Sequence, residues 1–330
     1  MHTTKETNVL INAEIERDKT GRIEYIDIAK GIGMILVVVG HCIDAKTFPG
    51  TWIYCFHMPL FFVLSGLCFN DKKYPTFLPF LKKRIKTLFL PCIYFSLIIT
   101  VLSVTLFNNY HASNLLHGFP GGLWFVFVLF ISELFYWFIN RLLTKHLKGI
   151  SLIVSFVIGY LLNKWQISLP YSICSIFVAT FFYGLGHLCK DKINFLTQLP
   201  RTYAFFIGFL LLIIPGVVVY FKETYIGMSV NAIPNPALLY CLIAISGTLG
   251  TLTLCTFDYG KIKRIFLFIG KNTLTILGTH IFFINLSSHY ISPLIGNYLL
   301  YKISEQMVIW MAVVICCYVV NKKAPWMIGK

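Results

Sequence analysis

Apolar stretches of about 20 residues recur along the chain, and short polar segments separate them. A helix needs about 20 apolar residues to cross a bilayer, so this pattern predicts an all-α polytopic membrane protein. A membrane β-barrel would instead show short segments of alternating hydrophobicity. About ten transmembrane helices are predicted, at residues 28–46, 52–70, 88–106, 122–140, 150–164, 171–189, 203–221, 236–256, 266–288 and 304–321. The fifth is short, and the ninth could consist of two pieces.

Lysine and arginine are distributed unequally between alternate loops, and this asymmetry predicts the orientation. With the N-terminus in the cytosol, the outer segments keep only Lys46, Lys164, Lys222 and Lys302. The cytosolic segments then collect Lys72, Lys73, Lys82, Lys83, Arg84, Lys86, Arg141, Lys145, Lys148, Lys190, Lys192, Arg201, Lys261, Lys263, Arg264, Lys322, Lys323 and Lys330. We therefore expect a multi-pass protein of the inner (cytoplasmic) cell membrane, with cytosolic tails at 1–25 and 323–330 and a transmembrane domain at 26–322.

Composition supports this class. The chain has 330 residues, of which 57% are hydrophobic and 12% charged, and a soluble protein of this size could not bury so much apolar surface. The net charge of +15 lies in clusters between the spans, which indicates cytosolic loops rather than a nucleic-acid partner. The 10 cysteines lie mostly in spans and form no Cys-x-x-Cys pair, so we expect neither a disulfide nor a metal site.

Ionisable residues interrupt the first two spans. Lys30 and His41 are eleven positions apart, which places them on nearly the same side of one helix, with Asp27 and Asp44 close to that side. His57 follows in the second span. Ionisable side chains are costly inside a membrane, so they are functional candidates by default. The alternative is that each histidine only forms a hydrogen bond between helices.

Helical rise places these groups by depth. His41 and His57 are expected at the same depth, towards the outside, because a short turn joins the two spans that carry them. Glu133 and His280 fall nearer the middle, and a lone carboxylate at that depth needs a partner. Lys30, Arg84 and Lys86 fall at the cytosolic face, where Arg84 and its neighbours could be ordinary membrane anchors. This layout suits either a reaction or a transport path.

Several motifs resemble the acyltransferase-3 family of membrane O-acyltransferases. They are Asp27-x-x-Lys30-Gly31, Gly40-His41, Phe56-His57-Met58-Pro59-Leu60-Phe61-Phe62, Leu64-Ser65-Gly66, Leu123-Trp124-Phe125 and Gly270-Lys271-Asn272-Thr273 leading to His280. The resemblance covers residues 25–320 and is nearest to the fucose 4-O-acetylase-like branch. It implies an enzyme that moves acetyl from cytosolic acetyl-CoA, used as a co-substrate, to a hydroxyl of an envelope carbohydrate. No permanently bound cofactor is implied.

The resemblance also implies roles for individual residues. The catalytic histidine of the family falls on His41. The arginine usual ahead of it is Lys30 here, which keeps the charge and loses the planar fork. The family's Arg-x-x-Arg pair reads Arg84-Ile85-Lys86-Thr87, so Lys83 or Lys86 would have to replace the second arginine in binding acyl-CoA.

Chemistry agrees with these roles. Histidine suits the base that takes the hydroxyl proton, although His41 could instead carry the acyl group. Cations at the inner face, namely Lys30, Lys83, Arg84 and Lys86, would hold the phosphates of CoA.

His57 is the nearest donor for the oxyanion. Glu133 and His280 complete the candidate catalytic set, while Asp27, Asp44 and Trp124 are supporting candidates. Asp44 either orients His41 or is interfacial, and Trp124 resembles an interfacial anchor.

The rival hypothesis is a transporter or exporter of a polysaccharide or its precursor, for which intramembrane ionisable groups are equally expected. The partners implied by the first reading are acyl-CoA, a carbohydrate acceptor and the lipid bilayer. The sequence leaves open whether the protein is a monomer or a homo-oligomer.

Overall fold

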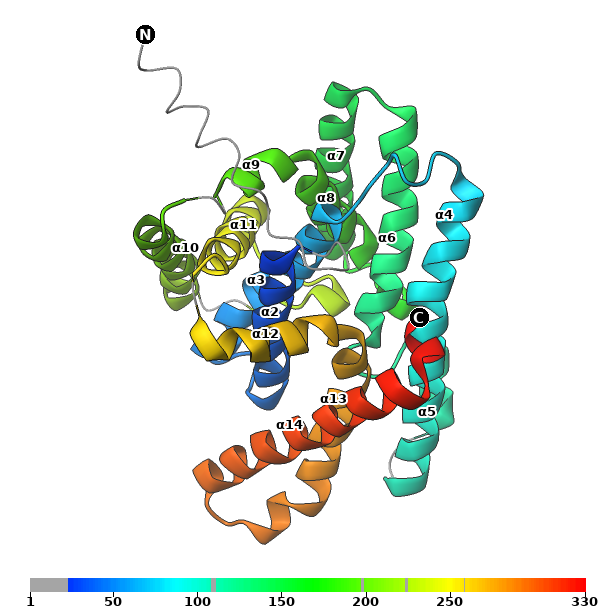
Figure 1. Ribbon diagram of the computed structural model, residues 1–330, viewed down its shortest axis with the longest axis vertical. Coiled ribbons are helices and arrows are strands. Elements are labelled where there is room, and N and C mark those ends of the chain that lie inside the picture. The colour runs from blue at the N-terminus through cyan, green and yellow to red at the C-terminus, as the bar shows by residue number, and fades with distance from the viewer. Residues whose placement is uncertain (1–22, 108–110, 197–198, 223–224, 258) are drawn as a thin grey trace.

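A computed structural model describes residues 23–107, 111–196, 199–222, 225–257 and 259–330, so the predicted tail at 1–25 lies almost wholly outside the described residues. The described chain folds into helices joined by mostly short loops (Figure 1). The helices are α2 (Glu24–Cys42), α3 (Phe48–Leu67), α4 (Phe77–Arg84), α5 (Leu90–Leu106), α6 (Leu123–Leu142), α7 (Lys145–Lys164), α8 (Ser175–Leu188), α9 (Lys190–Leu196), α10 (Arg201–Phe221), α11 (Ala237–Leu254), α12 (Lys263–Lys271), α13 (Thr273–Tyr290) and α14 (Tyr298–Lys323).

The membrane class predicted from the hydropathy pattern is confirmed. Within the described ranges, nine helical segments are long and apolar enough to span a bilayer, and a bent pair raises the number to ten. That pair is α12 and α13, which meet at an angle of 84°. The ninth predicted span, 266–288, is therefore two helices. The helix of the fifth predicted span, α7, begins at Lys145 rather than at residue 150. The helix of the third predicted span begins at Phe77 rather than at residue 88.

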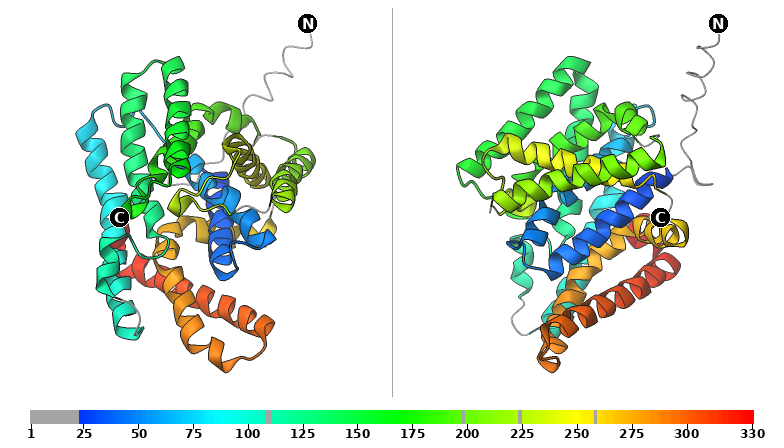
Figure 2. Two further views of the ribbon diagram at one scale, coloured as in Figure 1. Left: turned by 180° about the vertical axis from the view of Figure 1, so that it is seen from behind. Right: turned by 90° about the vertical axis from the view of Figure 1, so that its left-hand side faces the viewer.

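Helices α2 and α3 form the centre of the bundle, and the other helices pack around them (Figures 1 and 2). Helix α3 is the most buried of the candidate spans, and it contacts α2, α8, α10 and α11. Helices α13 and α14 pack against each other as an antiparallel arm at one side of the bundle (Figure 2). The first two spans of the sequence therefore make the core on which the site is built.

Glycines let α2 and α12 cross at backbone contact. A Cβ atom on Gly31 would overlap the carbonyl oxygen of Phe266, and one on Gly270 would overlap that of Asp27. Small residues are the usual means of close helix packing in membranes, where the hydrophobic effect does not drive helices together. An ion pair between Glu24 and Lys263 joins the same two helices. This crossing brings Thr273, at the start of α13, to the same cavity as Lys30.

A π-helical turn, Ile85–Phe89, connects α4 and α5 into one continuous span. Pro91 follows this turn and lacks the N–H needed for an ordinary helical bond, and its ring would crowd the carbonyl group one turn earlier. A widened turn accommodates such a residue. The amide of Leu90 accordingly bonds to the carbonyl of Ile85. Because the helix is continuous, Arg84 lies within it rather than at its end.

The last residues pack against the bundle. A short 3₁₀ helix, Pro325–Ile328, buries Met327 and sets Trp326 against Tyr94, with ring centroids 5.0 Å apart. The predicted C-terminal tail at 323–330 is thus an ordered part of the fold.

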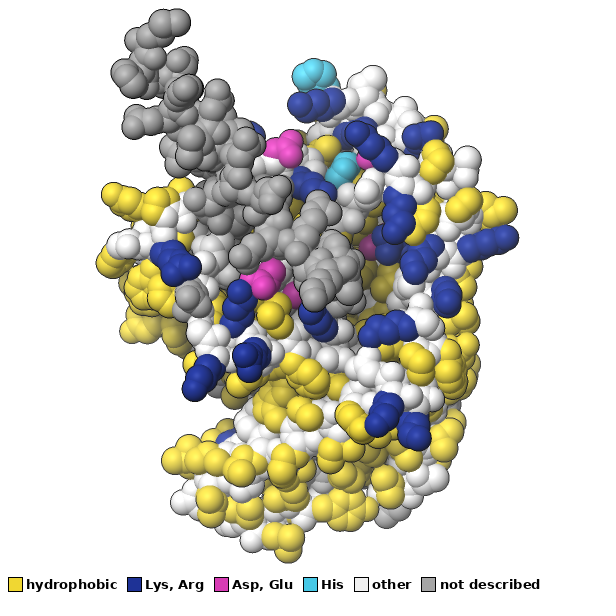
Figure 3. Space-filling view, viewed as in Figure 1, with side chains coloured by type: hydrophobic (Ala, Val, Ile, Leu, Met, Phe, Trp, Pro, Cys, Tyr) yellow, Lys and Arg dark blue, Asp and Glu magenta, His cyan; other side chains and the backbone are white. Residues whose placement is uncertain are grey.

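Figure 3 shows Lys and Arg side chains over the upper part of the face in view, whereas the lower part, over the α13–α14 arm, is mostly hydrophobic.

Candidate active site

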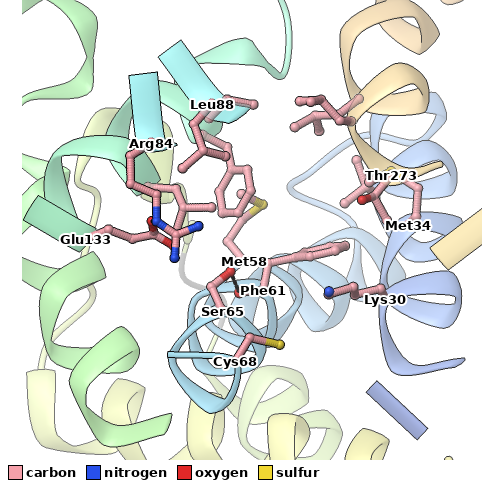
Figure 4. Close-up of a pocket in the computed structure, with 16 residues that line it drawn as sticks. Lys30, Met34, Met58, Phe61, Ser65, Cys68, Arg84, Leu88, Glu133 and Thr273 are labelled. Atoms are coloured by element: carbon pink, nitrogen blue, oxygen red, sulfur yellow. Dashed lines mark hydrogen bonds and ion pairs between the residues drawn. The ribbon is translucent and has the colours of Figure 1, made fainter. Parts of the chain in front are cut away.

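A cavity of about 240 Å³ lies between α2, α3, α6, α13 and the α4–α5 span (Figure 4). Its walls are mostly apolar and include Met34, Val37, Met58, Phe61, Leu88, Phe125, Val126, Leu129, Leu274 and Leu277. Its polar lining residues are Lys30, Ser65, Cys68, Arg84, Glu133 and Thr273. Lys30 and Arg84 approach the cavity from opposite sides (Figure 4). We call this space the central cavity; it combines a cationic part with an apolar channel.

Arg84 forms an ion pair with Glu133 at the wall of the central cavity. The Arg84 Nε atom lies 2.6 Å from Glu133 Oε2, and the carboxylate is almost fully buried, with a side-chain exposure of 5%. The guanidinium group also lies over the ring of Phe80, 5.1 Å from its centroid. Glu133 was expected to need a partner at mid-membrane depth, and Arg84 is that partner. The sequence predicted Arg84 at the cytosolic face and Glu133 deeper, so it did not predict this ion pair.

Lys83 and Lys86 were predicted to share the acyl-CoA site with Arg84. Both side chains are exposed and neither lines the central cavity. The reason is helical geometry, since positions next to Arg84 in sequence point about 100° to 200° away from it. The structure therefore separates Arg84 and Lys30, which face the cavity, from Lys83 and Lys86, which do not.

A second, more polar cavity of about 390 Å³ adjoins the first. The two share Lys30, Cys68 and Thr273 as lining residues. The second cavity adds Asp27, Asn70, Lys190 and Lys271, among others. Asp27 is buried, and its Oδ1 atom lies 4.0 Å from Lys30 Nζ, so the acidic candidate accompanies the lysine as predicted. We call this space the basic vestibule, because three lysines line it.

The three predicted membrane histidines meet at one place. The ring centroids of His41 and His280 are 5.3 Å apart. Tyr54 joins the third histidine to them, because its ring lies 6.1 Å from that of His41 and 5.0 Å from that of His57. The Tyr54 hydroxyl oxygen is 3.3 Å from His41 Nδ1. We call these four residues the histidine cluster.

Backbone carbonyl groups fix the tautomers of two members. His57 Nδ1 lies 2.8 Å from the carbonyl oxygen of Ile53, and His280 Nδ1 lies 3.0 Å from that of Ile276. A carbonyl oxygen can only accept, so each Nδ1 carries the proton and each neutral ring keeps a lone pair on Nε2. His280 Nε2 is buried and has no hydrogen-bond partner among the described residues. In this tautomer a neutral His57 presents an acceptor rather than a donor at Nε2.

The central cavity leads towards the histidine cluster on three helices. Val37 lines it one helical turn before His41, and Leu277 lines it one turn before His280. Met58, the neighbour of His57, lines it as well. Lys30 and His41 are separated by about 16 Å along α2, at 1.5 Å per residue. A long, thin molecule held at Lys30 could therefore present its far end to the histidines.

Two supporting candidates lie apart from this arrangement. Asp44 is exposed beyond the end of α2, and its Oδ1 atom accepts a hydrogen bond of 2.9 Å from the amide of Lys46. This position favours the interfacial alternative over an orienting role for His41. Trp124 is half-buried, and it lines a different cavity from its neighbour Phe125.

Sequence reasoning missed four residues. Tyr54 precedes His57 by three positions, and this helical spacing was the available signal. Ser65 and Cys68 follow on the same helix and line the central cavity, although neither carries a charge that would single it out. Glu305 is buried in α14, where it accepts a bond of 2.7 Å from the Tyr301 hydroxyl and pairs with Lys302 at 2.8 Å. Glu305 falls at the start of the predicted span 304–321, where a charged residue is ordinary, so it was not identified as a candidate.

Comparison with known proteins gives a family. A family model described as an acyltransferase domain matches residues 23–320. The nodulation protein NolL of Mesorhizobium japonicum is 33% identical over 122 residues, which cover 32% of this chain and 33% of that protein. The chain thus matches about a third of the length of this curated relative. No solved structure matches this chain. Since the family model covers nearly the whole helical bundle, including the histidine cluster and both cavities, the chain belongs to the acyltransferase family of multi-pass membrane proteins.

Proposed function

We propose that this acyltransferase takes an acyl group, such as acetyl, from cytosolic acyl-CoA and places it on a hydroxyl group of a cell-envelope carbohydrate. The observation that carries the proposal is the central cavity, which has cations near the basic vestibule and leads towards the histidine cluster. Family membership favours an enzyme over the rival polysaccharide transporter. The layout also suits a donor that is anionic at one end and reactive at the other.

The basic vestibule offers a seat for the phosphate groups of the donor. Lys30, Lys190 and Lys271 line it, and ammonium groups bind phosphate as compact charges. The apolar wall of the central cavity suits the thin pantetheine arm, which carries the thioester at its far end. Acyl-CoA would enter as a co-substrate and leave as CoA. This assignment transfers the donor role from Lys83 and Lys86 to Lys190 and Lys271, while Lys30 keeps it.

At the histidine cluster, His41 would take the proton of the acceptor hydroxyl as its oxygen attacks the thioester carbon. A new C–O bond forms, the C–S bond breaks, and the proton passes to the departing sulfur of CoA. In the alternative relay, His41 itself carries the acyl group before the hydroxyl attacks. Tyr54 is the hydroxyl donor nearest His41, and it would stabilise the oxyanion in place of His57. His57 and His280 would serve as hydrogen-bond acceptors through the lone pair on Nε2.

The test combines cleavage of the donor with modification of the glycan. Protein purified in detergent is given acetyl-CoA, and the free CoA thiol is measured. In parallel, a strain lacking the gene is complemented, and acetyl esters on its envelope glycan are measured by NMR. His41→Gln keeps bulk and hydrogen bonding but can neither act as a base nor carry an acyl group, so both signals should fall to background.

His111→Gln is the matched control, because His111 is exposed in a loop away from the cluster. It should keep wild-type activity in both assays. A wild-type protein that restores glycan export without cleaving acetyl-CoA would instead support the transporter. Wild-type acetylation in a well-expressed His41→Gln strain would contradict both the base and the relay roles.

A further inference from the structure

A third large cavity, of about 600 Å³, lies on the other face of α6 from the central cavity. It is built from the loop before α6, the segment between α7 and α8, and the segment before α11. We call it the aromatic cleft, because Phe119, Trp124 and Tyr171 line it. Neither the family match nor the proposed donor path assigns it a role.

The lining of the aromatic cleft combines aromatic rings with small polar groups. The rings of Phe119 and Tyr171 lie 5.1 Å apart. The lining also includes Ser168, Ser172 and Ser229. A sugar presents apolar C–H faces and hydroxyl edges, so it is matched by aromatic faces together with hydroxyl and backbone groups. Its described lining residues include His117 but no Lys, Arg, Asp or Glu, which favours an uncharged sugar over a phosphorylated or acidic one.

The wall of the cleft is held in an unusual backbone conformation. Tyr171, Ser172 and Asn231 have φ angles of 58°, 57° and 54°, in the left-handed region that residues other than glycine rarely adopt. Such strain persists only where the surroundings enforce it, and it clusters at ligand sites. The Tyr171 hydroxyl donates to the carbonyl of Leu115 at 2.7 Å, and Asn231 Nδ2 donates to that of Gly159 at 2.8 Å. The cleft is therefore shaped in advance of any ligand.

The aromatic cleft adjoins the histidine cluster through α6. Trp124 lines the cleft, while the next residue, Phe125, lines the central cavity. Two positions earlier, Gly122 packs so closely on His280 that a Cβ atom there would lie 3.2 Å from its Cε1 atom. The first turn of α6 thus lies between the aromatic cleft and the central cavity.

We propose that the aromatic cleft binds the acceptor, as an uncharged sugar unit of a glycan, and directs its hydroxyl to the histidine cluster. This inference rests on the acyltransferase function proposed above. It places donor and acceptor on opposite faces of α6. Binding of the acceptor can then be disturbed without disturbing acyl-CoA, and the test depends on that separation.

Two substitutions fill the cleft with an indole ring. Ser168→Trp and Ser229→Trp alter lining residues from different segments, whereas Ser113→Trp places the same ring on an exposed position that does not line the cleft. Each variant complements a strain lacking the gene, and acetyl esters on the envelope glycan are measured. The affinity of each purified variant for acetyl-CoA is measured by equilibrium dialysis. Both filling variants should lose acetylation by at least about tenfold, with acetyl-CoA affinity within about twofold of wild type, and Ser113→Trp should match wild type in both measurements.

The remaining outcomes each decide against a specific claim. Wild-type acetylation in both filling variants would overturn the acceptor assignment. Loss of acetyl-CoA binding in both, with Ser113→Trp intact, would also overturn it, because the cleft would then belong to the donor path. A wild-type gene that restores no acetylation while its purified product leaves acetyl-CoA uncleaved would overturn the proposed function itself. Testing two positions ensures that misfolding of one variant does not decide the result.

Discussion

His41 of α2 and His280 of α13 are in contact, with their ring centroids 5.3 Å apart. The ring of His280 thus contacts that of His41 directly, whereas His57, the histidine predicted at the depth of His41, is linked to His41 through Tyr54. The Nε2 atom of His280 is buried and lacks a hydrogen-bond partner in the described part of the chain. A buried acceptor of this kind calls for an explanation, and a catalytic role is one.

If the two histidines act as one unit, their effects on rate should not add. We expect His41→Gln and His280→Gln each to reduce glycan acetylation strongly, and the double variant to be no worse than His41→Gln alone. Acetyl-ester levels in complemented cells, normalised to membrane protein, check this. Simple addition of the two effects would make His280 a packing residue.

Tyr54→Phe removes the hydroxyl that lies 3.3 Å from His41 Nδ1 while keeping the ring between His41 and His57. We expect kcat to fall by about 100-fold with little change in the KM for acetyl-CoA, because a lost oxyanion donor acts on the transition state. Steady-state release of CoA measures both constants. Tyr290→Phe, on an exposed side chain far along α13, is the control. An unchanged kcat would exclude Tyr54 from the reaction.

Glu133→Gln should leave the half-buried guanidinium group of Arg84 without its ion pair. Breaking a buried pair by removing one partner costs about 3 kcal/mol or more, whereas replacing both partners with apolar residues costs much less. We therefore expect Glu133→Gln to lower the melting temperature in detergent, and Arg84→Met with Glu133→Met to recover much of the loss. Equal destabilisation in the single and double variants would contradict the pairing.

If acyl-CoA binds as proposed, Lys30→Gln should weaken binding of acetyl-CoA, since Lys30 lines both the central cavity and the basic vestibule. Lys83→Gln and Lys86→Gln are matched controls on exposed positions that line neither. The wild-type affinity should also fall as salt screens the phosphate contacts. Equilibrium dialysis with acetyl-CoA measures all four proteins. If Lys86→Gln weakens binding as much as Lys30→Gln, the donor path runs along the outer side of α4 instead.

Labelling of cysteines tests the orientation predicted from the lysine and arginine asymmetry. Cys68, which is exposed, is first replaced by Ser. In this background Ser113→Cys should react with an impermeant maleimide in intact cells, and Lys72→Cys should react only after the membrane is opened. The reverse labelling of both positions would invert the topology and, with it, the side from which acyl-CoA enters.

The class of the protein and its spans were predictable, because about 20 apolar residues in succession have few other uses. Helix ends were less so. Lys145 begins α7, and Arg84 lies inside a continuous helix, because long basic side chains let a helix extend past its apolar stretch. Hydropathy therefore underestimated both helices at their basic ends.

The candidate site was only partly predictable, because the predicted depths separated Arg84 from Glu133 and His41 from His280, which the structure brings together. Helical rise and the short turn predicted that His41 and His57 lie near each other, and the ring of Tyr54 links them. The Arg84–Glu133 pair and the His41–His280 contact each join helices whose relative rotation is not encoded in any local pattern. The tautomer of His57 depends on a carbonyl of its own helix, so it too became visible only in three dimensions.

The close packing of Gly122 on His280 is relevant to how such an enzyme would avoid hydrolysing its acyl donor. Water carries the same O–H group as a sugar, and a bare Nε2 atom would activate either one. The histidines themselves provide no means of choosing between them. Selectivity against hydrolysis must then come from excluding water from the cluster, and Gly122 packs against His280 and Leu277 with no room for a larger side chain. A larger residue at position 122 would disturb this packing, and with it the exclusion of water on which such an enzyme would depend.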